Sequence, residues 1–398
     1  MILNKDFIEV LYEAAHIQRW NDHIRPQGFT ELDKQAHKMV ILYVLARYEE
    51  QDHDITLNWQ VLIEGGIFEF LHRIILTDIK PPVFHELMRV HGKKLNDWVY
   101  GELERKVPGI DRDFLARMKN YFDTEIYLKE KKLLKAAHYL ATEWEFRIVY
   151  HLNQGIYDVE ATKAAIANEI EEHYDLAGVQ KISLGGKTRK FVDLVGQLRF
   201  QKRWAQSPRV PETSVMGHMI IVAILGYFCA LRLDACPKRA VNDFLCGLLH
   251  DLPEVLTRDI ISPIKRSVQG LDELIKDIEK RQIEEKILPL LPSEWHREIL
   301  YFTENEFADR AVVQGDIIIC ESPDEINEKY NENKYRAIDG SVLKGCDNLA
   351  AFVEAWLSRR HGITAMHLLE GEAKIREMYR GRNIAGISFQ DIFDQFEQ

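Results

Sequence analysis

An internal repeat constrains the fold of this chain most strongly, because each half must build a similar arrangement of secondary structure. Four segments of the first half recur in the same order in the second half, with the same apolar spacing and shared polar residues. The pairs are 6–20 with 190–204, both ending in Arg-Trp; the apolar runs that follow His37 and His218; the runs around His72 and His250; and the segments ending at Phe146 and Ala355. The chain is therefore expected to contain two related domains in tandem.

Both copies carry the pattern of helices. Apolar residues recur at positions i, i+3, i+4 and i+7 opposite charged faces, and alternating, strand-like runs are few. The sequence predicts an all-α protein of tandem helical bundles, with domains at 1–184 and 185–398. The polar, glycine-containing segment 178–190 is the expected boundary. The second copy is longer than the first, which predicts an insertion near 312–341 that forms a surface excursion or lid.

Composition limits the classes of partner. We expect no apolar run to approach the roughly 18 to 20 residues of a membrane span, and charges interrupt the N-terminal segment, which together predict a cytoplasmic protein with no membrane partner. The five cysteines are odd in number and mostly lie in apolar segments, which disfavours a disulfide framework. A formal net charge of −11 argues against general affinity for duplex nucleic acid and favours small ligands.

Ionisable groups in the second half lie at the ends of apolar segments or within them. They are His218, the adjacent His250 and Asp251, and Asp347. A buried carboxylate must be neutralised, paired or bound to metal, and two imidazoles with two carboxylates form a donor set suited to a divalent metal. A single buried histidine is more often a satisfied core residue, so the prediction depends on all four together. Asp316 is a rival for Asp347, because it lies closer in sequence to the His-Asp pair.

This order of His, His-Asp and Asp resembles the HD-domain metal-dependent phosphohydrolases. The stretches "RVPETSVMGH", "HDLPEVLTRDIISPIK" and "LKGCD" are similar to the bacterial 5'-deoxynucleotidase, or YfbR-like, branch. The chain departs from that branch at Gly217, where an acidic residue is expected, and in the long insertion. The resemblance implies one divalent ion, with Mn, Co, Fe, Ni and Zn all admissible by ligand type, and a nucleotide substrate. Such an ion lowers the pKa of a bound water and polarises a phosphoryl oxygen.

Further residues of the second copy are candidates for catalysis and substrate binding. Glu254 lies three residues after Asp251, so a helix continuing past Pro253 would return it to the same face as a general acid or base. The resemblance implies that Arg203 holds the phosphate and that Trp204 offers a flat surface to the sugar or base. It also implies a catalytic role for Asp259 and substrate contacts for Thr257 and Lys265.

The first copy has lost the residues that this chemistry needs. Arg73 follows His72 where the second copy has an aspartate, and His138 replaces the second carboxylate. We therefore expect a degenerate, structural domain that packs as a built-in partner, while Arg19 and Trp20 leave room for a regulatory nucleotide or phosphate. A metal there would require His37, His72, His138 and a neighbour such as Asp78 to form a different site.

Three functions compete on this evidence. The leading hypothesis is an enzyme that releases phosphate from (deoxy)nucleoside 5'-monophosphates. Phosphodiesterase or nucleotide triphosphohydrolase activity is the second, because similar ligands open different phosphorus bonds. A non-enzymatic, nucleotide-responsive regulatory protein is the third, motivated by the degenerate copy. The sequence leaves homo-oligomerisation open.

Overall fold

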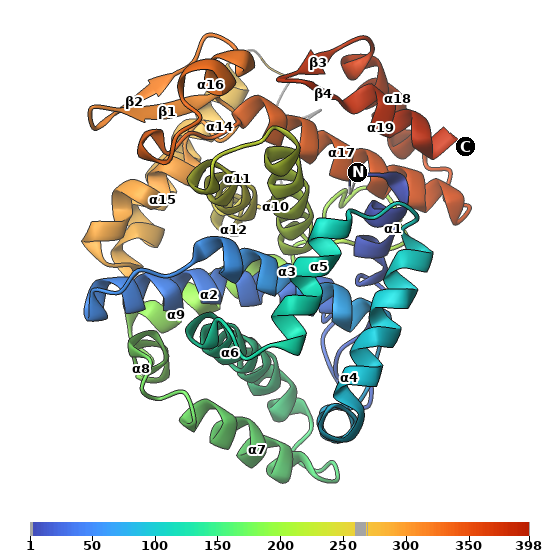
Figure 1. Cartoon of the computed structure of the whole chain (residues 1–398), viewed down its shortest axis with the longest axis vertical. Coiled ribbons are helices and arrows are strands. Elements are labelled where there is room, and N and C mark those ends of the chain that lie inside the picture. The colour runs from blue at the N-terminus through green and yellow to red at the C-terminus, as the bar shows by residue number, and fades with distance from the viewer. Residues whose placement is uncertain (1–2, 259–267, 269, 398) are drawn as a thin grey trace. The chain divides into compact units, whose positions relative to one another are not determined.

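The computed structural model describes residues 3–258, 268 and 270–397 and divides into two compact units, Met1–Gln180 and Lys181–Gln398 (Figure 1). The division falls four residues before the expected boundary, inside the polar segment 178–190. That segment is mostly helical and not a loop, because α8 (Ala177–Ser183) and α9 (Lys187–Gly196) occupy most of it.

The protein is 69% helical with 4% strand, so the all-α prediction is confirmed. The helices of the first unit are α1 (Lys5–Glu13), α2 (Glu31–His53), α3 (Trp59–Leu76), α4 (Pro81–Lys106), α5 (Arg112–Asp123), α6 (Leu128–Leu152) and α7 (Val159–Glu171), followed by α8 across the division. The long helix α2 is buried over most of its length and packs against α6 and α3.

The second unit has the same helical character with two small hairpins added. Its helices are α9, α10 (Val215–Arg232), α11 (Pro237–Leu249), α12 (Glu254–Thr257), α14 (Leu271–Gln282), α15 (His296–Thr303), α16 (Pro323–Lys329), α17 (Gly340–Arg360), α18 (Met366–Tyr379) and α19 (Phe389–Asp394). Short helical turns are η1 (Gln197–Arg199), η2 (Ile283–Ile287), η3 (Leu288–Leu290), η4 (Ser293–Trp295), η5 (Asn333–Tyr335) and η6 (Gln395–Glu397). The antiparallel hairpins are β1 (Arg310–Val313) with β2 (Asp316–Ile319), and β3 (Asn383–Ile384) with β4 (Ile387–Ser388).

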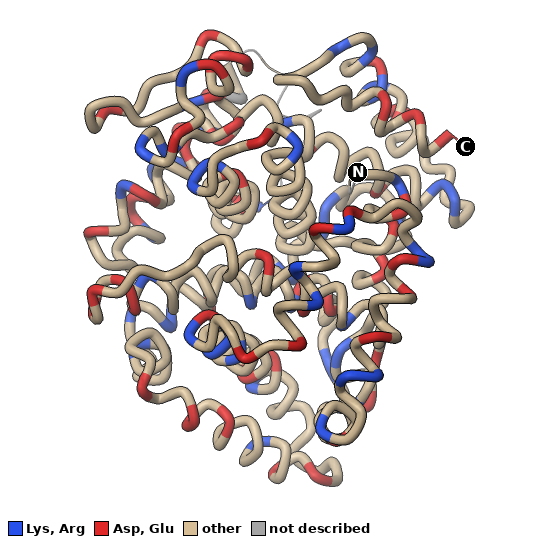
Figure 2. The backbone as a smooth tube through the Cα atoms, viewed as in Figure 1, with Lys and Arg blue, Asp and Glu red and all other residues tan. Residues whose placement is uncertain are grey.

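Helix α10 forms the centre of the second unit. Its N-cap, Ser214, accepts a hydrogen bond from the Gly217 N–H at 2.9 Å, which fixes where the helix begins. The helix is long and apolar enough to cross a membrane by length and composition, which corrects our expectation that no run approaches that length. It is 89% buried, as a core helix of a globular protein is, and Figure 2 shows it as a nearly uncharged tube.

Glycines let the neighbouring helices approach α10 closely. A Cβ added at Gly247 of α11 would lie 2.8 Å from the Cα of Ala223, so only glycine allows this contact. A Cβ at Gly226 would lie 2.5 Å from a methyl group of Leu343 on α17. These contacts hold the end of α11 and the first turns of α17 against the same helix.

The region predicted as an insertion is partly anchored to the core. It contains most of the β1–β2 hairpin and α16, and a small core of Ala311, Ile326 and Ala337 lies beneath them. The buried Arg239 of α11 donates to both carboxylate oxygens of Asp339, each at 2.7 Å. The hairpin strand β2 is largely exposed, as a surface excursion would be, while the buried ion pair attaches the end of the region to α11.

Candidate metal centre

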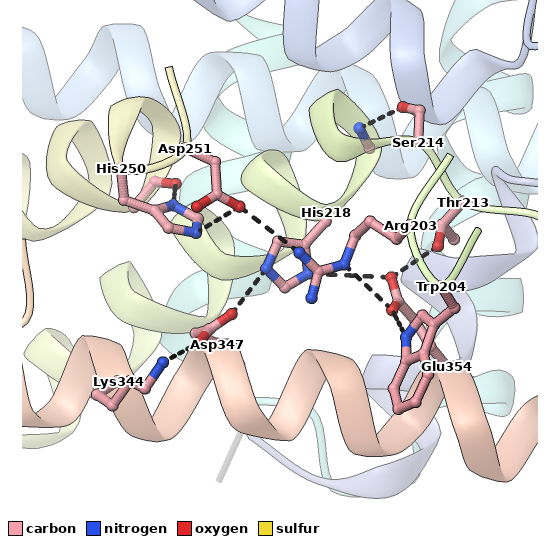
Figure 3. A network of polar contacts seen from close by, with 12 residues as sticks. Arg203, Trp204, Thr213, Ser214, His218, His250, Asp251, Lys344, Asp347 and Glu354 are labelled. Atoms are coloured by element: carbon pink, nitrogen blue, oxygen red, sulfur yellow. Dashed lines mark hydrogen bonds and ion pairs between the residues drawn. The ribbon is translucent and has the colours of Figure 1, made fainter. Parts of the chain in front are cut away.

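Three of the residues predicted to bind a metal converge in the second unit. His218 lies in the first turn of α10, His250 directly follows α11, and Asp347 lies in the second turn of α17. One ligand atom from each lies within 4.8 Å of the others, in a group that Figure 3 shows at close range. The packing of α11 and α17 on α10 thus gathers residues that are far apart in sequence.

The hydrogen bond of His250 selects its protonation state. Its Nδ1 lies 2.8 Å from the carbonyl oxygen of Gly247, and a carbonyl can only accept, so Nδ1 carries the proton. The other nitrogen, Nε2, then has its lone pair available on the side of the cluster. Backbone carbonyls orient many metal-binding histidines in this way.

His218 lies between two carboxylates and is fully buried. Its Nε2 is 2.9 Å from Oδ1 of Asp347, and its Nδ1 is 3.9 Å from Oε1 of Glu354. The Asp347 carboxylate can only accept, so Nε2 of His218 donates across the 2.9 Å contact. A cation bound between these two atoms would take the place of that proton, and Nδ1, which faces Glu354, would then carry it. The donor set of two imidazoles and one carboxylate therefore fits a divalent transition ion.

The charges around the cluster keep its carboxylates ionised. Burial would raise the pKa of Asp347, but Lys344, whose Nζ lies 2.7 Å from Oδ2, and His218 hold that pKa well below its usual range. Burial would lower the pKa of His250, but the neighbouring Asp251 carboxylate outweighs it and raises this pKa. Asp347 thus stays ionised and available as a ligand at neutral pH, and a bound cation would compete with the proton that Asp251 favours on His250.

Asp251, the fourth predicted ligand, lies beside the group of three and not within it. Its Oδ2 is 3.1 Å from Nε2 of His250 and 3.6 Å from a terminal nitrogen of Arg203. Burial would raise the pKa of Asp251, but His250 and the other nearby cations hold it far below its usual range. Asp251 therefore connects the candidate metal ligands to Arg203, which was predicted to bind phosphate.

Glu354 is a central residue of this site that sequence reasoning missed. Its carboxylate accepts hydrogen bonds from Nε1 of Trp204 at 2.9 Å and from Oγ1 of Thr213 at 2.7 Å, and pairs with Arg203 at 3.4 Å (Figure 3). It also pairs with Arg209 at 3.6 Å. Burial would raise its pKa, but Arg209 and Arg203 lower it to about 2. A signal was present, because the segments ending at Phe146 and Ala355 both have glutamate as the residue before last.

The other residues predicted for catalysis, substrate binding or metal binding lie outside the group of His218, His250 and Asp347. Glu254 is buried at the start of α12, and its N–H donates to the Asp251 carbonyl at 3.0 Å. Helix α11 ends at Leu249 and a new short helix, α12, begins after Pro253, so the condition of one helix continuing past Pro253 is not met. Thr257 is the last residue of α12. Asp316, the rival ligand, lies exposed at the start of β2. Asp259 and Lys265 lie outside the described residues.

Comparison with known proteins identifies the same part of the chain. Residues 195–376 match the family model described as an HD domain. The chain is 26% identical over 162 residues to a 5'-deoxynucleotidase of Vibrio atlanticus, a match that covers 38% of this chain and 83% of that protein. It is 30% identical over 110 residues to a 5'-deoxynucleotidase of Photobacterium profundum, covering 26% of this chain and 55% of that protein.

Proposed function

Because residues 195–376 are an HD domain, we propose that this protein is a metal-dependent phosphohydrolase that releases phosphate from (deoxy)nucleoside 5'-monophosphates. The convergence of His218, His250 and Asp347 beside the Arg203–Asp251 pair is the observation that carries the proposal. It brings a metal-binding donor set and a candidate phosphate-binding group into one network. The names of the two bacterial relatives support the choice of substrate.

His218, His250 and Asp347 would hold the ion, and Asp251 is the proposed fourth ligand because it already contacts His250. When bound, a Mn, Co, Fe, Ni or Zn ion polarises a phosphoryl oxygen and lowers the pKa of water. The second carboxylate also balances the charge, since two carboxylates with two neutral imidazoles match a divalent cation.

Arg203 is the proposed phosphate-binding residue. Its guanidinium is held on one side by Glu354 and on the other by Asp251, so its orientation is set before substrate arrives. A planar guanidinium forms two parallel hydrogen bonds to a phosphate. The adjacent Trp204 has its ring nitrogen fixed by Glu354 and is the proposed surface for the sugar or base, with Thr257 and Lys265 as further substrate contacts.

Glu254 is the proposed general acid or base, one turn after Asp251, with Asp259 as a second catalytic candidate. Proton transfer contributes roughly 10² to 10⁴ in rate, so Glu254→Ala should lower kcat by that factor while metal content and substrate binding persist. Glu273→Ala, which removes an exposed glutamate on α14, is the matched control. Equal kcat in the Glu254→Ala variant and the parent, with chemistry rate-limiting, would remove Glu254 from the mechanism.

A phosphate-release screen of the full chain tests the proposed reaction. The substrates are nucleoside and deoxynucleoside mono-, di- and triphosphates and cyclic dinucleotides, each with Mn, Co, Fe, Ni or Zn. We expect inorganic phosphate from the deoxynucleoside monophosphates and none from a His250→Ala Asp251→Ala variant. Release of pyrophosphate or triphosphate would favour a triphosphohydrolase, opening of cyclic dinucleotides a phosphodiesterase, and binding without turnover the regulatory function.

A further inference from the structure

The first unit begins its central helix with the same contacts as the second unit, 184 residues earlier in the chain. An antiparallel bridge joins Gln18 to Thr30 in the first unit and Lys202 to Ser214 in the second. The Arg19 N–H donates to the Phe29 carbonyl at 2.8 Å, as the Arg203 N–H donates to the Thr213 carbonyl at 3.2 Å. The Glu31 N–H donates to the Ile17 carbonyl at 2.9 Å, as the Val215 N–H donates to the Gln201 carbonyl at 2.8 Å. Trp20 and Trp204 even share a left-handed backbone, with φ of 56° and 55°. These contacts align residues 17–34 with residues 201–218 one by one.

This alignment identifies the counterpart of the metal ligand His218. Thr30 and Ser214 are the N-caps, and the fourth residue after each cap donates its N–H to the cap carbonyl, Lys34 at 3.1 Å and His218 at 3.0 Å. Lys34 therefore takes the place of His218. Our pairing of His37 with His218 from the sequence is wrong by three residues, which is nearly one helical turn.

The side chain of Lys34 repeats the contact that His218 makes. Its Nζ lies 3.1 and 3.2 Å from the two ring nitrogens of His138, the counterpart of Asp347 in the repeated segment. Lys34 is fully buried, with an exposed fraction of 1%. The first unit has thus kept the geometry of this contact between its central helix and α6 while replacing both partners.

The charge at the ligand positions is reversed. With neutral imidazoles, the two aspartates of the second unit give a formal charge of −2. In the first unit the contacts place Lys34 and His138 at two of these positions, and the sequence repeat assigns His72 and Arg73 to the other two. Arg73 then contributes one positive charge and Lys34 a second when protonated. Burial lowers the pKa of Lys34, opposed by Glu31 and Glu145. At these four positions no carboxylate remains to bind a divalent cation, and the nearby Glu31 and Glu145 are paired with Arg19 and Arg73.

A carboxylate lies between the two guanidinium groups of the first unit. Oε2 of Glu31 is 2.9 Å from a terminal nitrogen of Arg19 and 3.7 Å from Nε of Arg73. The second unit has the apolar Val215 at this position. The Arg-Trp pair keeps its other partner, since Glu145 binds Arg19 and Trp20 at 2.7 and 2.8 Å, as Glu354 binds their counterparts.

We infer that the first unit holds a second copy of the site that is filled by its own side chains. The amino group of Lys34 occupies the metal position, and the carboxylate of Glu31 occupies the position of a substrate phosphate. The first half of this inference rests on the contacts of Lys34 and on the proposed metal ligands of the second unit. The second half rests on the proposed function of Arg203 as the phosphate-binding residue. The first unit accordingly binds neither a divalent ion nor a phosphate.

Restoring the ligands tests the metal half. A full-length Lys34→His Arg73→Asp His138→Asp variant should bind one more Mn or Co ion per chain than its parent after dialysis, measured by elemental analysis. The control Lys34→Ala Arg73→Ala His138→Ala removes the same cations without adding ligands and should bind no extra ion. No extra ion in the restored variant, with circular dichroism showing a folded chain, overturns the metal half. This measurement does not depend on any hydrolytic activity.

Removing the internal carboxylate tests the phosphate half. In a full-length background with the second site disabled by Arg203→Ala, His250→Ala and Asp251→Ala, the chain should not bind inorganic phosphate in equilibrium dialysis. Adding Glu31→Gln should create binding, whereas adding Glu64→Gln, which removes a buried glutamate paired with Arg117, should not. Phosphate binding before Glu31 is replaced, or its absence afterwards, overturns this half. The metal half then still stands.

Discussion

Replacing Glu354 by glutamine should destabilise the second unit and impair its site together. Glutamine keeps the shape of the side chain but removes the charge that Arg203 and Arg209 share. The side chain of Glu354 is fully buried and that of Arg209 is 2% exposed, so water cannot replace the lost partner. The structure thus predicts an uncompensated buried cation next to Trp204.

The magnitude follows from two independent estimates. Breaking a buried ion pair by removing one partner costs about 3 to 5 kcal/mol. The pKa of Glu354 falls from an ordinary 4.5 to about 2, which corresponds to about 3 kcal/mol of favourable interaction with its surroundings. Because the folded-state pKa lies below the unfolded one, this stabilisation is present above about pH 4.5 and is lost as the pH falls toward 2.

Hydrogen exchange and phosphate-release kinetics are the two assays. Amides of α17 should lose about 3 kcal/mol of protection in Glu354→Gln at neutral pH, and less at lower pH. Because Arg203 loses its support, kcat/KM should fall about tenfold or more, a loss of about 1.4 kcal/mol per tenfold. The ligands His218, His250 and Asp347 remain, so metal should still bind at saturating concentration, with a lower affinity because Glu354 faces Nδ1 of His218.

Glu145→Gln is a matched control within the same chain. Glu145 is equally buried and binds Arg19 and Trp20 as Glu354 binds the pair in the second unit. It should lower protection in α6 of the first unit by a similar amount and leave phosphate release unchanged. Full activity in Glu354→Gln, or an equal loss of activity in Glu145→Gln, would refute the idea that Glu354 supports the reaction through Arg203.

The other predictions concern the metal ligands and Arg203. A His250→Ala Asp251→Ala chain should contain no bound transition ion by elemental analysis. An ion that is still bound to this variant would show that the metal site lies elsewhere. Asp347→Ala should abolish turnover and weaken metal binding while Asp316→Ala has little effect, and the reverse ranking would exchange their roles. Arg203→Ala should raise KM and lower kcat. Arg203→Lys should restore little of this activity, because an ammonium cannot form the two parallel hydrogen bonds of a guanidinium. Full activity in Arg203→Lys would contradict the assigned phosphate geometry.

Apolar periodicity was sufficient to predict the helical fold and the main convergence. Long apolar runs ending in ionisable residues place His218 at the start of one buried helix and His250 at the end of another, so both must find partners in the interior. The repeat favoured Asp347 over Asp316, and the structure places Asp347 beside the histidines and Asp316 on an exposed strand. These assignments needed the order of helices, the internal repeat and the cost of burying charge.

Side-chain direction was beyond the reach of the sequence pattern. Asp251 directly follows His250, yet its carboxylate lies toward Arg203 because the chain bends after α11 and Pro253 precedes a new helix. Glu354 lies on a helix face whose spacing resembles that of an ordinary core, and only its contacts with the loop before α10 show its role. Both depend on how segments meet in space.

The position of Lys34 shows why periodicity alone aligned the first unit incorrectly. Lys34 and His37 are three residues apart, so they lie on neighbouring positions of one helix face, and a shift of three preserves the apolar pattern. Because His37 and His218 are both followed by an apolar run, an alignment by sequence pattern alone pairs these two histidines. The N-cap removes this ambiguity, because Thr30 fixes the start of α2 through its hydrogen bond to Asp33, as Ser214 fixes α10. Counting from the cap pairs Lys34 with His218. Under the inference drawn above, Lys34, Arg73 and His138 together would then keep the arrangement of the site without its chemistry.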